Sequence, residues 1–388
     1  MQTQLQTEAA EQIAMLRESA VDFVAGSTDF KKYRERRRTL PGYDPALVQQ
    51  MAELGWFGIL VPEAHGGLGL GFSELSVVLQ ELGKGLLGDP LVASAVLAGR
   101  VIQHGDNEEL KARLLPQLVD ASLLPCVAWQ EGTGGLDVQA IATRAQADGD
   151  AVRISGRKRF VAGAAAAGGF VVSALDEAGC GLYWVDRDAA GLTLSHEWRA
   201  DETPSGILEL DQVRVVAADV LSPGGSAAVA ALERAVQEAA VMASAEMMGV
   251  IEAALKMALD YMRTREQFGK KIGSFQALQH KAADLYVQQE VARSVLEDAV
   301  RELDSQGDVR ARALLANRCK SRSSDVGLRV TREVIQLHGA IGYTDEYDAG
   351  LFLKRALVLS GWLGNASAHR RQFGSLFNDA TMGYSSEG

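Results

Sequence analysis

An arginine beside a loop interrupted by glycines is the first feature of this sequence that could do chemistry. A predicted helix ends at Phe268-Gly269 with Arg265 in its last turn, the loop continues through Gly273, and a second helix is predicted from about Ser274. A guanidinium there can bind an anionic group through paired hydrogen bonds, and the amides that open a helix also attract anions. Phe268 adds a flat apolar surface. The segment is a candidate phosphate site, with a solvated helical turn as the alternative.

A second segment with similar properties follows further along the chain. A predicted helix ends at Gly339, and Gln336 lies one turn earlier. Glycine at such a point lets a ligand or another backbone approach closely, although a plain helix end is equally compatible. Serine-hydrolase, zinc-protease, Walker and dinucleotide-binding motifs are absent, and the six histidines have no metal-ligand spacing. Neither segment alone identifies a reaction.

Three blocks of different periodicity must position these segments. Residues 1–124 show apolar residues at helical spacing, 125–225 show short stretches of period two separated by turns, and 226–388 are helical again. Asp44 and Asn107 are predicted to cap two helices of the first block, and 170–172 is one of the predicted strands. An apolar stripe from Ala282 to Leu303 predicts a helix in the third block. We therefore predict a mainly helical α+β protein, with an N-terminal helical domain, a middle antiparallel β domain and a C-terminal helical domain. The C-terminal helices are long enough to suit a bundle that also packs against other subunits.

Composition excludes several classes of protein. The chain has 388 residues, with 39 Lys and Arg against 50 Asp and Glu, and a net charge of -11 disfavours a dedicated nucleic-acid binder. The most apolar stretch, 160–175, is too short and too rich in glycine to span a membrane. No signal peptide is recognisable, and the three cysteines suggest no disulfide framework. We expect a cytoplasmic protein with no membrane, nucleic-acid or metal partner.

The two loop segments together resemble the acyl-CoA dehydrogenase signatures. Residues 265–276 (REQFGKKIGSFQ) follow the pattern R-x-Q-F-G-x-x-I-x-x-F-Q, and residues 336–346 (QLHGAIGYTDE) resemble Q-x-x-G-G-x-G-x-T-x-E. Segments 54–67, 129–137 and 156–162 resemble further blocks of the family. The resemblance covers nearly the whole chain, which is identified as a member of this family.

Membership implies a fold and a reaction. The fold has an N-terminal helical domain, a middle β domain and a C-terminal four-helix bundle, with FAD between the last two. The reaction is α,β-desaturation of an acyl-CoA thioester, in which a carboxylate removes the α-proton and a hydride passes to flavin N5. Electrons then leave through an electron-transfer flavoprotein. Fatty-acid β-oxidation, dicarboxylate catabolism and steroid side-chain catabolism are the pathways that the resemblance suggests.

The resemblance also implies which residues contact FAD. Gln130 replaces the threonine that bonds the flavin ring, and Phe160 replaces the tryptophan that packs beside it. An amide can still donate a hydrogen bond, and a phenyl ring can still pack. The residues carried over to the pyrophosphate and adenine, several of them reaching the FAD of a neighbouring subunit, are Arg265, Gln267, Phe268, Phe275, Gln276, Gln336, Leu337 and Gly339.

The catalytic base of the family is missing from its usual place. Most members carry a glutamate nine residues after an arginine, and nine residues after Arg355 is Gly364. The threonine that contacts FAD two residues later is replaced by Ala366. The sequence therefore offers no carboxylate where most of the family has one.

A minority of the family places the glutamate on an earlier helix, at the position that corresponds to Ala239. Glu238 is adjacent, but one residue rotates a side chain by about 100° around a helix. Glu246 lies on nearly the same face, about 10 Å further along the axis. Both are candidate bases, with an ion-paired or surface carboxylate as the alternative for each.

Three hypotheses follow. The chain also resembles the shorter subunits of two-component acyl-CoA dehydrogenases, which form α2β2 assemblies, so a longer homologue would supply the base. Alternatively, the chain is a self-sufficient homotetramer with Glu238 or Glu246 as the base. Thirdly, it is a base-less or flavin-free structural partner of a heterotetramer. The identity of the acyl chain and the choice between dehydrogenase and oxidase stay open.

Overall fold

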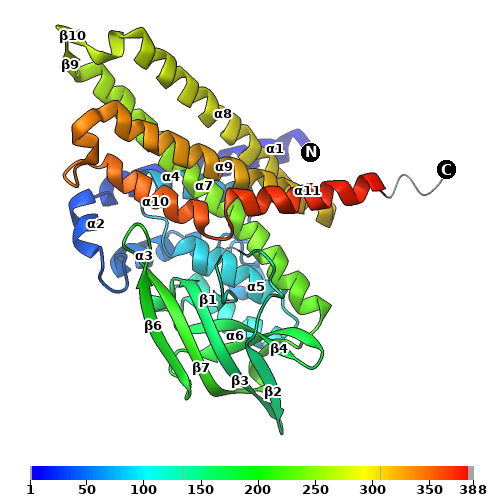
Figure 1. Ribbon diagram of the computed structural model, residues 1–388. Helices are drawn as coiled ribbons and strands as arrows, with labels where there is room; N and C mark the ends of the chain where they lie inside the picture. Colours follow the sequence, from blue (N-terminus) through cyan, green and yellow to red (C-terminus); the bar gives the residue numbers. More distant parts are fainter. Residues whose placement is uncertain (1, 134, 306, 383–388) are drawn as a thin grey trace. The chain divides into compact units, whose positions relative to one another are not determined.

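The structure, a computed structural model, describes residues 2–133, 135–305 and 307–382 (Figure 1). The chain divides into two compact units. The first, here called the helical unit, comprises Met1–Phe30, Phe72–Gly88 and Ala240–Gly388. The second, here called the sheet unit, comprises Lys31–Gly71 and Asp89–Ala239. None of the described helices combines the length and apolar character needed to cross a membrane.

The sheet unit contains an eight-stranded sheet, shown in green and cyan in Figure 1. The strands are β1 (Pro125–Ala128), β2 (Arg144–Asp148), β3 (Ala151–Ala162), β4 (Gly169–Asp176), β5 (Gly179–Asp186), β6 (Leu192–Trp198), β7 (Pro204–Val216) and β8 (Val220–Ser222). Their order is β6-β7-β3-β2-β4-β5-β8, and β1 also pairs with β4. The predicted β domain is present, and most of its pairings are antiparallel. Two are parallel, because β1 and β2 both run alongside β4 in the same direction.

Apolar side chains from several strands form the core of this sheet. Ile154 of β3, Phe170 and Val172 of β4, and Leu208 and Val213 of β7 are each fully buried in one cluster. Burying side chains of this size stabilises the fold by roughly 1.5–3 kcal/mol each. Burial alternates along the second half of β7, where Leu208, Leu210, Val213 and Val215 are buried, whereas β4 is buried on both faces, since Val171 between Phe170 and Val172 is buried too.

Capping residues predicted from the sequence begin two of the N-terminal helices. Asp44 accepts a hydrogen bond from the amide of Ala46 at 3.0 Å, and Pro45 takes the first helical position. Asn107 accepts one from the amide of Leu110 at 3.0 Å. Each side chain satisfies an amide that the helix leaves unpaired, so both predictions are confirmed. The N-terminal helices are α1 (Gln2–Ser27), α2 (Phe30–Arg36), α3 (Pro45–Glu53), α4 (Phe72–Lys84), α5 (Gly99–His104) and α6 (Glu108–Val119).

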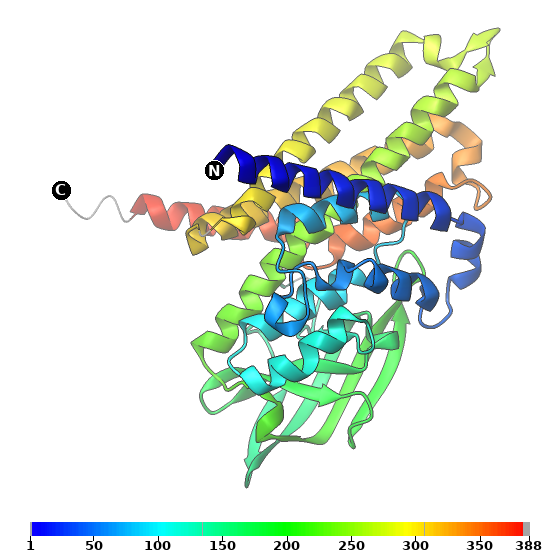
Figure 2. The ribbon, with the colours of Figure 1, turned by 180° about the vertical axis from the view of Figure 1, so that it is seen from behind.

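Long helices make up the C-terminal part of the chain, and the view from behind shows them as well (Figure 2). They are α7 (Ser226–Thr264), α8 (Gln276–Asp304), α9 (Val309–His338), α10 (Ala349–Gly361) and α11 (Ala366–Met382). α9 packs against α8, α10 and α11. The apolar stripe predicted on α8, from Ala282 to Leu303, is buried. The predicted mainly helical α+β architecture is confirmed.

α4 and α7 approach each other closely within the helical unit. A Cβ added to Gly83 would collide with the carbonyl oxygen of Glu246, and one added to Gly249 would collide with that of Gln80. Asp304, the last residue of α8, accepts hydrogen bonds from the first amides of α4. Two glycines therefore set the helix separation, and a long-range cap fixes the start of α4.

A short hairpin separates α7 from α8, where the sequence predicted that the helix would continue to Phe268. α7 ends at Thr264, and β9 (Glu266–Gln267) pairs with β10 (Lys270–Lys271). Phe268 and Gly269 form the two-residue turn, with φ of 55° and 76°. Positive φ at both central residues is typical of the hairpin turn whose twist matches its strands. The helix end was therefore predicted too late.

Candidate functional site

The residues predicted to bind FAD fall into two groups, one in each unit. In the sheet unit, the backbone carbonyl of Gln130 accepts a hydrogen bond from the amide of Arg159 at 2.8 Å. Phe160 follows directly, at a break in the β3–β7 register, and its φ of 58° is left-handed. The Arg159 guanidinium carbon lies 4.7 Å from the centre of the Phe160 ring. The structure therefore brings Gln130 and Phe160 to one place, which we call the Gln130–Phe160 wall.

A buried lysine that the sequence analysis left without a role lies next to this wall. The Lys158 ammonium is fully buried and lies 2.8 Å from a carboxylate oxygen of Glu131. Both residues stand in segments that resemble the family, but nothing in their spacing pairs one with the other. The sequence does not show how β3 aligns with the neighbouring strands, so it could not predict that Lys158 and Glu131 meet.

In the helical unit, the β9–β10 hairpin carries the second group. Arg265, Gln267 and Phe268 are exposed, and Phe268 is 91% exposed. Within the part of the chain that the structure describes, the Arg265 guanidinium forms no ion pair, so its donors face solvent. The Phe268 and Phe275 rings meet edge to face at 6.2 Å. A guanidinium without an ion pair and two aromatic rings, carried by one short segment of the chain, suit a ligand that joins a phosphate to a planar base.

Gln276 and the end of α9 complete this group. Gln276 is the exposed first residue of α8, and Gln336 is exposed in the last turn of α9. Leu337, predicted to contact FAD, is only 6% exposed, so its side chain is buried in the helical unit. Gly339 has a φ of 66° with open space where a Cβ would stand. These features agree with the close approach predicted at this glycine.

Three aromatic rings tie the two loops of the helical unit together. The Tyr261 and His338 rings lie 4.5 Å apart, and the His338 and Tyr347 rings 4.6 Å apart. His338 Nδ1 donates to the carbonyl of Val334 at 2.7 Å, so its Nε2 accepts the Tyr347 hydroxyl at 2.9 Å. Burial lowers the pKa of His338, which keeps this neutral form. The end of α7 is thereby fixed to the end of α9.

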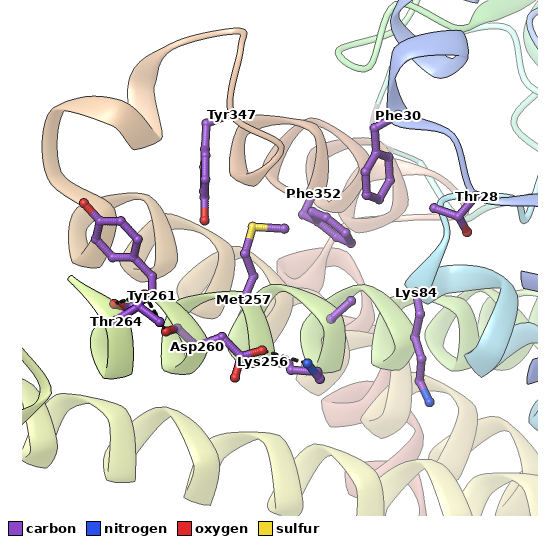
Figure 3. A pocket seen from close by; sticks show the side chains of 11 residues that line it. Thr28, Phe30, Lys84, Lys256, Met257, Asp260, Tyr261, Thr264, Tyr347 and Phe352 are labelled. Carbon is purple, nitrogen blue, oxygen red and sulfur yellow. Dashed lines mark hydrogen bonds and ion pairs between the residues drawn. The ribbon is translucent and has the colours of Figure 1, made fainter. Parts of the chain in front are cut away.

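A pocket of about 500 Å³ lies beside these rings (Figure 3). Tyr261 and Tyr347 line one end and the apposed rings of Phe30 and Phe352 the other, with Met257 between them. Charged residues at its edge are already paired, as Lys256 is with Asp260 at 2.7 Å. Its walls are therefore mostly apolar, and it contains none of the candidate bases.

Glu238, the first candidate base, is surrounded by nitrogen donors in the sheet unit. It is 1% exposed and accepts hydrogen bonds from Arg100 at 2.8 Å, Arg234 at 3.0 Å and His104 at 3.0 Å. Burial raises the pKa of Glu238, but the bonds from His104 and Arg100 outweigh burial and hold it at about 2. This environment makes Glu238 a weak proton acceptor.

Glu246, the second candidate, is fully buried in the helical unit. Arg355 of α10 donates to its Oε1 from Nε at 2.7 Å and from Nη2 at 2.6 Å. A Cβ at Gly88 would collide with the carboxylate, so the glycine makes room for it. Glu246 therefore forms a buried ion pair with the same arginine from which the usual base position is counted.

The usual base position lies in the tight turn between α10 and α11. Leu363 and Gly364 have φ of 57° and 93°. His369 donates to the Leu363 carbonyl at 2.8 Å, and Lys320 donates to the Leu359 carbonyl at 2.6 Å. Burial lowers the pKa of Lys320 to about 7 and that of His369 to about 4. The turn therefore carries no carboxylate; His369 bonds a carbonyl within it, and Lys320 bonds one in the last turn of α10.

Comparison with known protein families identifies the family of this chain. Models of the acyl-CoA dehydrogenase N-terminal, middle and C-terminal domains match residues 10–122, 126–213 and 229–375. The chain belongs to the acyl-CoA dehydrogenase family. It is accordingly an oxidoreductase that acts on CH–CH bonds, as predicted.

Individual acyl-CoA dehydrogenases show the same relationship. FadE12 of Mycobacterium tuberculosis (strain ATCC 25618 / H37Rv) is 31% identical over 319 residues, which are 79% of this chain and 81% of that protein. Cyclohex-1-ene-1-carbonyl-CoA dehydrogenase of Geobacter metallireducens is 29% identical, covering 81% and 84%. Among solved structures, a variant of the Tcur3481-Tcur3483 steroid ACAD is 33% identical with a TM-score of 0.86, covering 96% of this chain and 99% of that chain.

The family is FAD-dependent, and the residues present fit that cofactor. Arg265 has uncommitted donors for a pyrophosphate, and the exposed Phe268 ring offers a surface for an adenine. The left-handed Gly339, with no neighbour where a Cβ would stand, leaves space for close approach. Among the described residues, no three His, Cys, Asp or Glu side chains are grouped as a metal ion would need.

Proposed function

We propose that this chain is the FAD-binding, base-less subunit of a two-chain acyl-CoA dehydrogenase, and that a longer homologous chain supplies the catalytic carboxylate. One observation carries the proposal: none of the three candidate positions offers an uncommitted carboxylate. Glu238 is bonded to three cationic or neutral nitrogen donors, Glu246 is paired with Arg355, and position 364 is glycine.

The chemistry explains why these carboxylates are unsuitable. A base that removes an α-proton must reach the substrate and have a pKa raised toward neutrality by a dry environment. The hydrogen bonds to Glu238 lower its pKa to about 2 instead. Glu246 would have to leave Arg355, and a guanidinium without its partner is costly inside a protein. A carboxylate on another chain avoids both costs.

The retained residues support cofactor binding by this chain. Bound FAD would supply the acceptor for the hydride that leaves the acyl β-carbon. Arg265 would bind the pyrophosphate, Phe268 would stack near the adenine, and Gln336 would donate a side-chain hydrogen bond. Gln130 and Phe160 would line the flavin ring. Because the Arg265 hairpin is exposed, we propose that it serves the FAD of a neighbouring subunit.

Similar proteins support the assembly and the substrate class. The name Tcur3481-Tcur3483 steroid ACAD gives two components and mentions a steroid. The Geobacter metallireducens relative is named for a cyclic acyl group. We therefore propose an α2β2 assembly that acts on the CoA thioester of a bulky acyl group, such as a steroid side chain. A matched structure named for the electron transferring flavoprotein of Acidaminococcus fermentans supports a flavoprotein as the electron acceptor.

The visible absorption spectrum tests this proposal. The chain is purified alone and, separately, after co-expression with a longer homologue that keeps the glutamate. Acyl-CoA is then added without oxygen. We expect bleaching of the flavin band only in the two-chain preparation. Bleaching in the single chain would contradict the proposal and favour a homotetramer with its own base.

A variant of the hairpin tests the cofactor assignment in the same preparation. Arg265→Ala removes the proposed pyrophosphate contact, so we expect FAD affinity to fall at least tenfold, measured by quenching of flavin fluorescence. Arg263→Ala is the matched control, because Arg263 is also exposed and lies two residues before Arg265, but is already paired with Asp260 at 3.0 Å. Equal affinities for both variants would remove Arg265 from the cofactor site.

A further inference from the structure

The buried Lys158–Glu131 ion pair lies in the sheet unit beside both segments of the Gln130–Phe160 wall. Lys158 Nζ contacts Glu131 Oε1 at 2.8 Å, the Ser173 hydroxyl at 3.1 Å and the Trp129 carbonyl at 3.4 Å. The lysine side chain is 0% exposed and that of Glu131 is 17% exposed. Trp129 and Glu131 directly precede and follow Gln130 in the sequence, so the ammonium contacts the residue on each side of it.

Glu131 is held from its other side by the segment before β2. Its Oε1 accepts the Thr143 hydroxyl at 2.6 Å and the Thr143 amide at 3.0 Å, and its Oε2 accepts the Ala142 amide at 2.6 Å. Gly156 passes so close that a Cβ there would collide with Thr143. Burial raises the pKa of Glu131, but the bonds from Lys158 and Thr143 hold it at about 2. The carboxylate is therefore ionised and fully engaged.

Lys158 also fixes the other half of the Gln130–Phe160 wall. It is the last residue of β3 in register with β7 before the irregularity that contains Arg159 and Phe160. The Arg159 amide then donates to the Gln130 carbonyl at 2.8 Å. One ion pair thus anchors both segments that meet at the wall, immediately before the residues that would face a ligand.

The energetics indicate a role in orientation. Charges removed from water lose hydration, and well-packed apolar residues of similar size often stabilise a fold as much as a buried ion pair does. Ser173, Thr143 and the backbone groups supply directional partners that an apolar pair could not use. A buried pair with several directional bonds fixes orientation more effectively than it adds stability.

We propose that Lys158 and Glu131 are positioning residues that set the Gln130 amide and the Phe160 ring against the flavin ring. This inference rests on the proposed FAD binding. Neither residue touches the cofactor in this proposal; both act through the two segments that they anchor. Loss of the pair should therefore change the affinity for FAD and the environment of the flavin ring, in addition to any change in the stability of the fold.

Lys158→Met and the double variant Lys158→Met/Glu131→Gln test the inference in the FAD-binding preparation. Arg157→Met is the matched control, because Arg157 is the adjacent residue of β3 and its 2.7 Å ion pair with Glu209 is exposed. The readouts are the FAD dissociation constant, the shape of the visible absorption band and thermal unfolding. We expect at least a tenfold weaker FAD complex and an altered band for both Lys158 variants, and values within twofold of wild type for the control.

The double variant separates orientation from stability. It leaves no unpaired buried charge, so its unfolding temperature should return toward that of the wild type while its flavin band stays altered. A double variant that binds FAD with the wild-type affinity and band would overturn the positioning role. Failure of the wild-type protein to bind FAD, alone or with the longer chain, would instead contradict the proposed function and this inference with it.

Discussion

Glu238 and Glu246 lie on the same helix, α7, and both are almost completely buried, yet their surroundings differ. Glu238, in the sheet unit, accepts hydrogen bonds from Arg100, Arg234 and His104. Glu246, in the helical unit, is paired with Arg355 of α10. Glu238 thus lies at the centre of a local cluster of hydrogen bonds, whereas Glu246 joins α7 to α10 within the helical unit.

The comparison shows that burial alone does not produce a catalytic base. Burial opposes ionisation and raises the pKa of a carboxyl group, whereas a neighbouring cation lowers it. At Glu238 the hydrogen bond from His104 and the charge and hydrogen bonds of Arg100 outweigh burial, and the pKa is about 2. A buried carboxylate becomes a good base only where burial is not offset by counter-charges. Neither of these two glutamates meets that condition.

Removing Glu246 should give the largest effect. Glu246→Ala leaves the Arg355 guanidinium buried without this partner, and we expect the free energy of unfolding to fall by about 3–5 kcal/mol. Urea unfolding measures the loss. Asp260→Ala is the control on the same helix, since Asp260 forms exposed ion pairs with Lys256 and Arg263. A loss at Glu246 as small as that at Asp260 would mean that the buried pair does not join the helices as its geometry indicates.

Glu238 should appear in the acid dependence of stability. Its pKa is about 2 in the folded chain, whereas the ordinary pKa of a glutamate side chain is 4.5. A carboxyl group whose pKa is lower in the folded chain than in the unfolded chain stabilises the fold at any pH above the unfolded value. This stabilisation is lost as the pH falls from about 5 to about 2. The shift corresponds to roughly 3 kcal/mol.

Urea unfolding of the wild type and of Glu238→Gln across that pH range measures the contribution. The glutamine cannot titrate, so the variant should be less stable at neutral pH and should lose less stability on acidification. Parallel curves for the two proteins would show that the three nitrogen donors do not lower the pKa of Glu238 and would remove the contrast with a simple buried carboxyl group.

Local patterns in the sequence predicted the parts of the fold that depend on near neighbours. The cap at Asp44, the apolar stripe of α8 and the strand containing Phe170 each follow from residues a few positions apart, and each is present. The hairpin after α7 was missed, because a turn with Phe268 at positive φ is uncommon for a non-glycine residue. Propensity favours continuing the helix at that point.

Long-range partners account for what the sequence could not predict about the site. The spacing of Glu238 and Ala239 predicted which side of the helix Glu238 faces. Its hydrogen-bond partners Arg100 and His104, however, lie on another helix, α5. Glu131 and Lys158 likewise meet only through the sheet. Charges that decide a pKa are set by tertiary contacts, so sequence spacing could nominate carboxylates and could not rank them.

The smallest expected effect concerns catalysis itself. Glu238→Gln and Glu246→Gln keep the size of each side chain and an oxygen that can accept from arginine, while removing the proton acceptor. If the partner chain carries the base, the rate of flavin reduction by acyl-CoA in the two-chain assembly should stay within about threefold of wild type for both variants. Stopped-flow absorbance measures that rate at a temperature at which each variant is folded. A loss of a hundredfold or more in one variant alone would identify that glutamate as the base, because losing a general base typically costs a factor of 10² to 10⁴. For Glu246 such a loss would also require Arg355 to release the carboxylate when substrate binds, and the buried pair would then be a resting state of the active site.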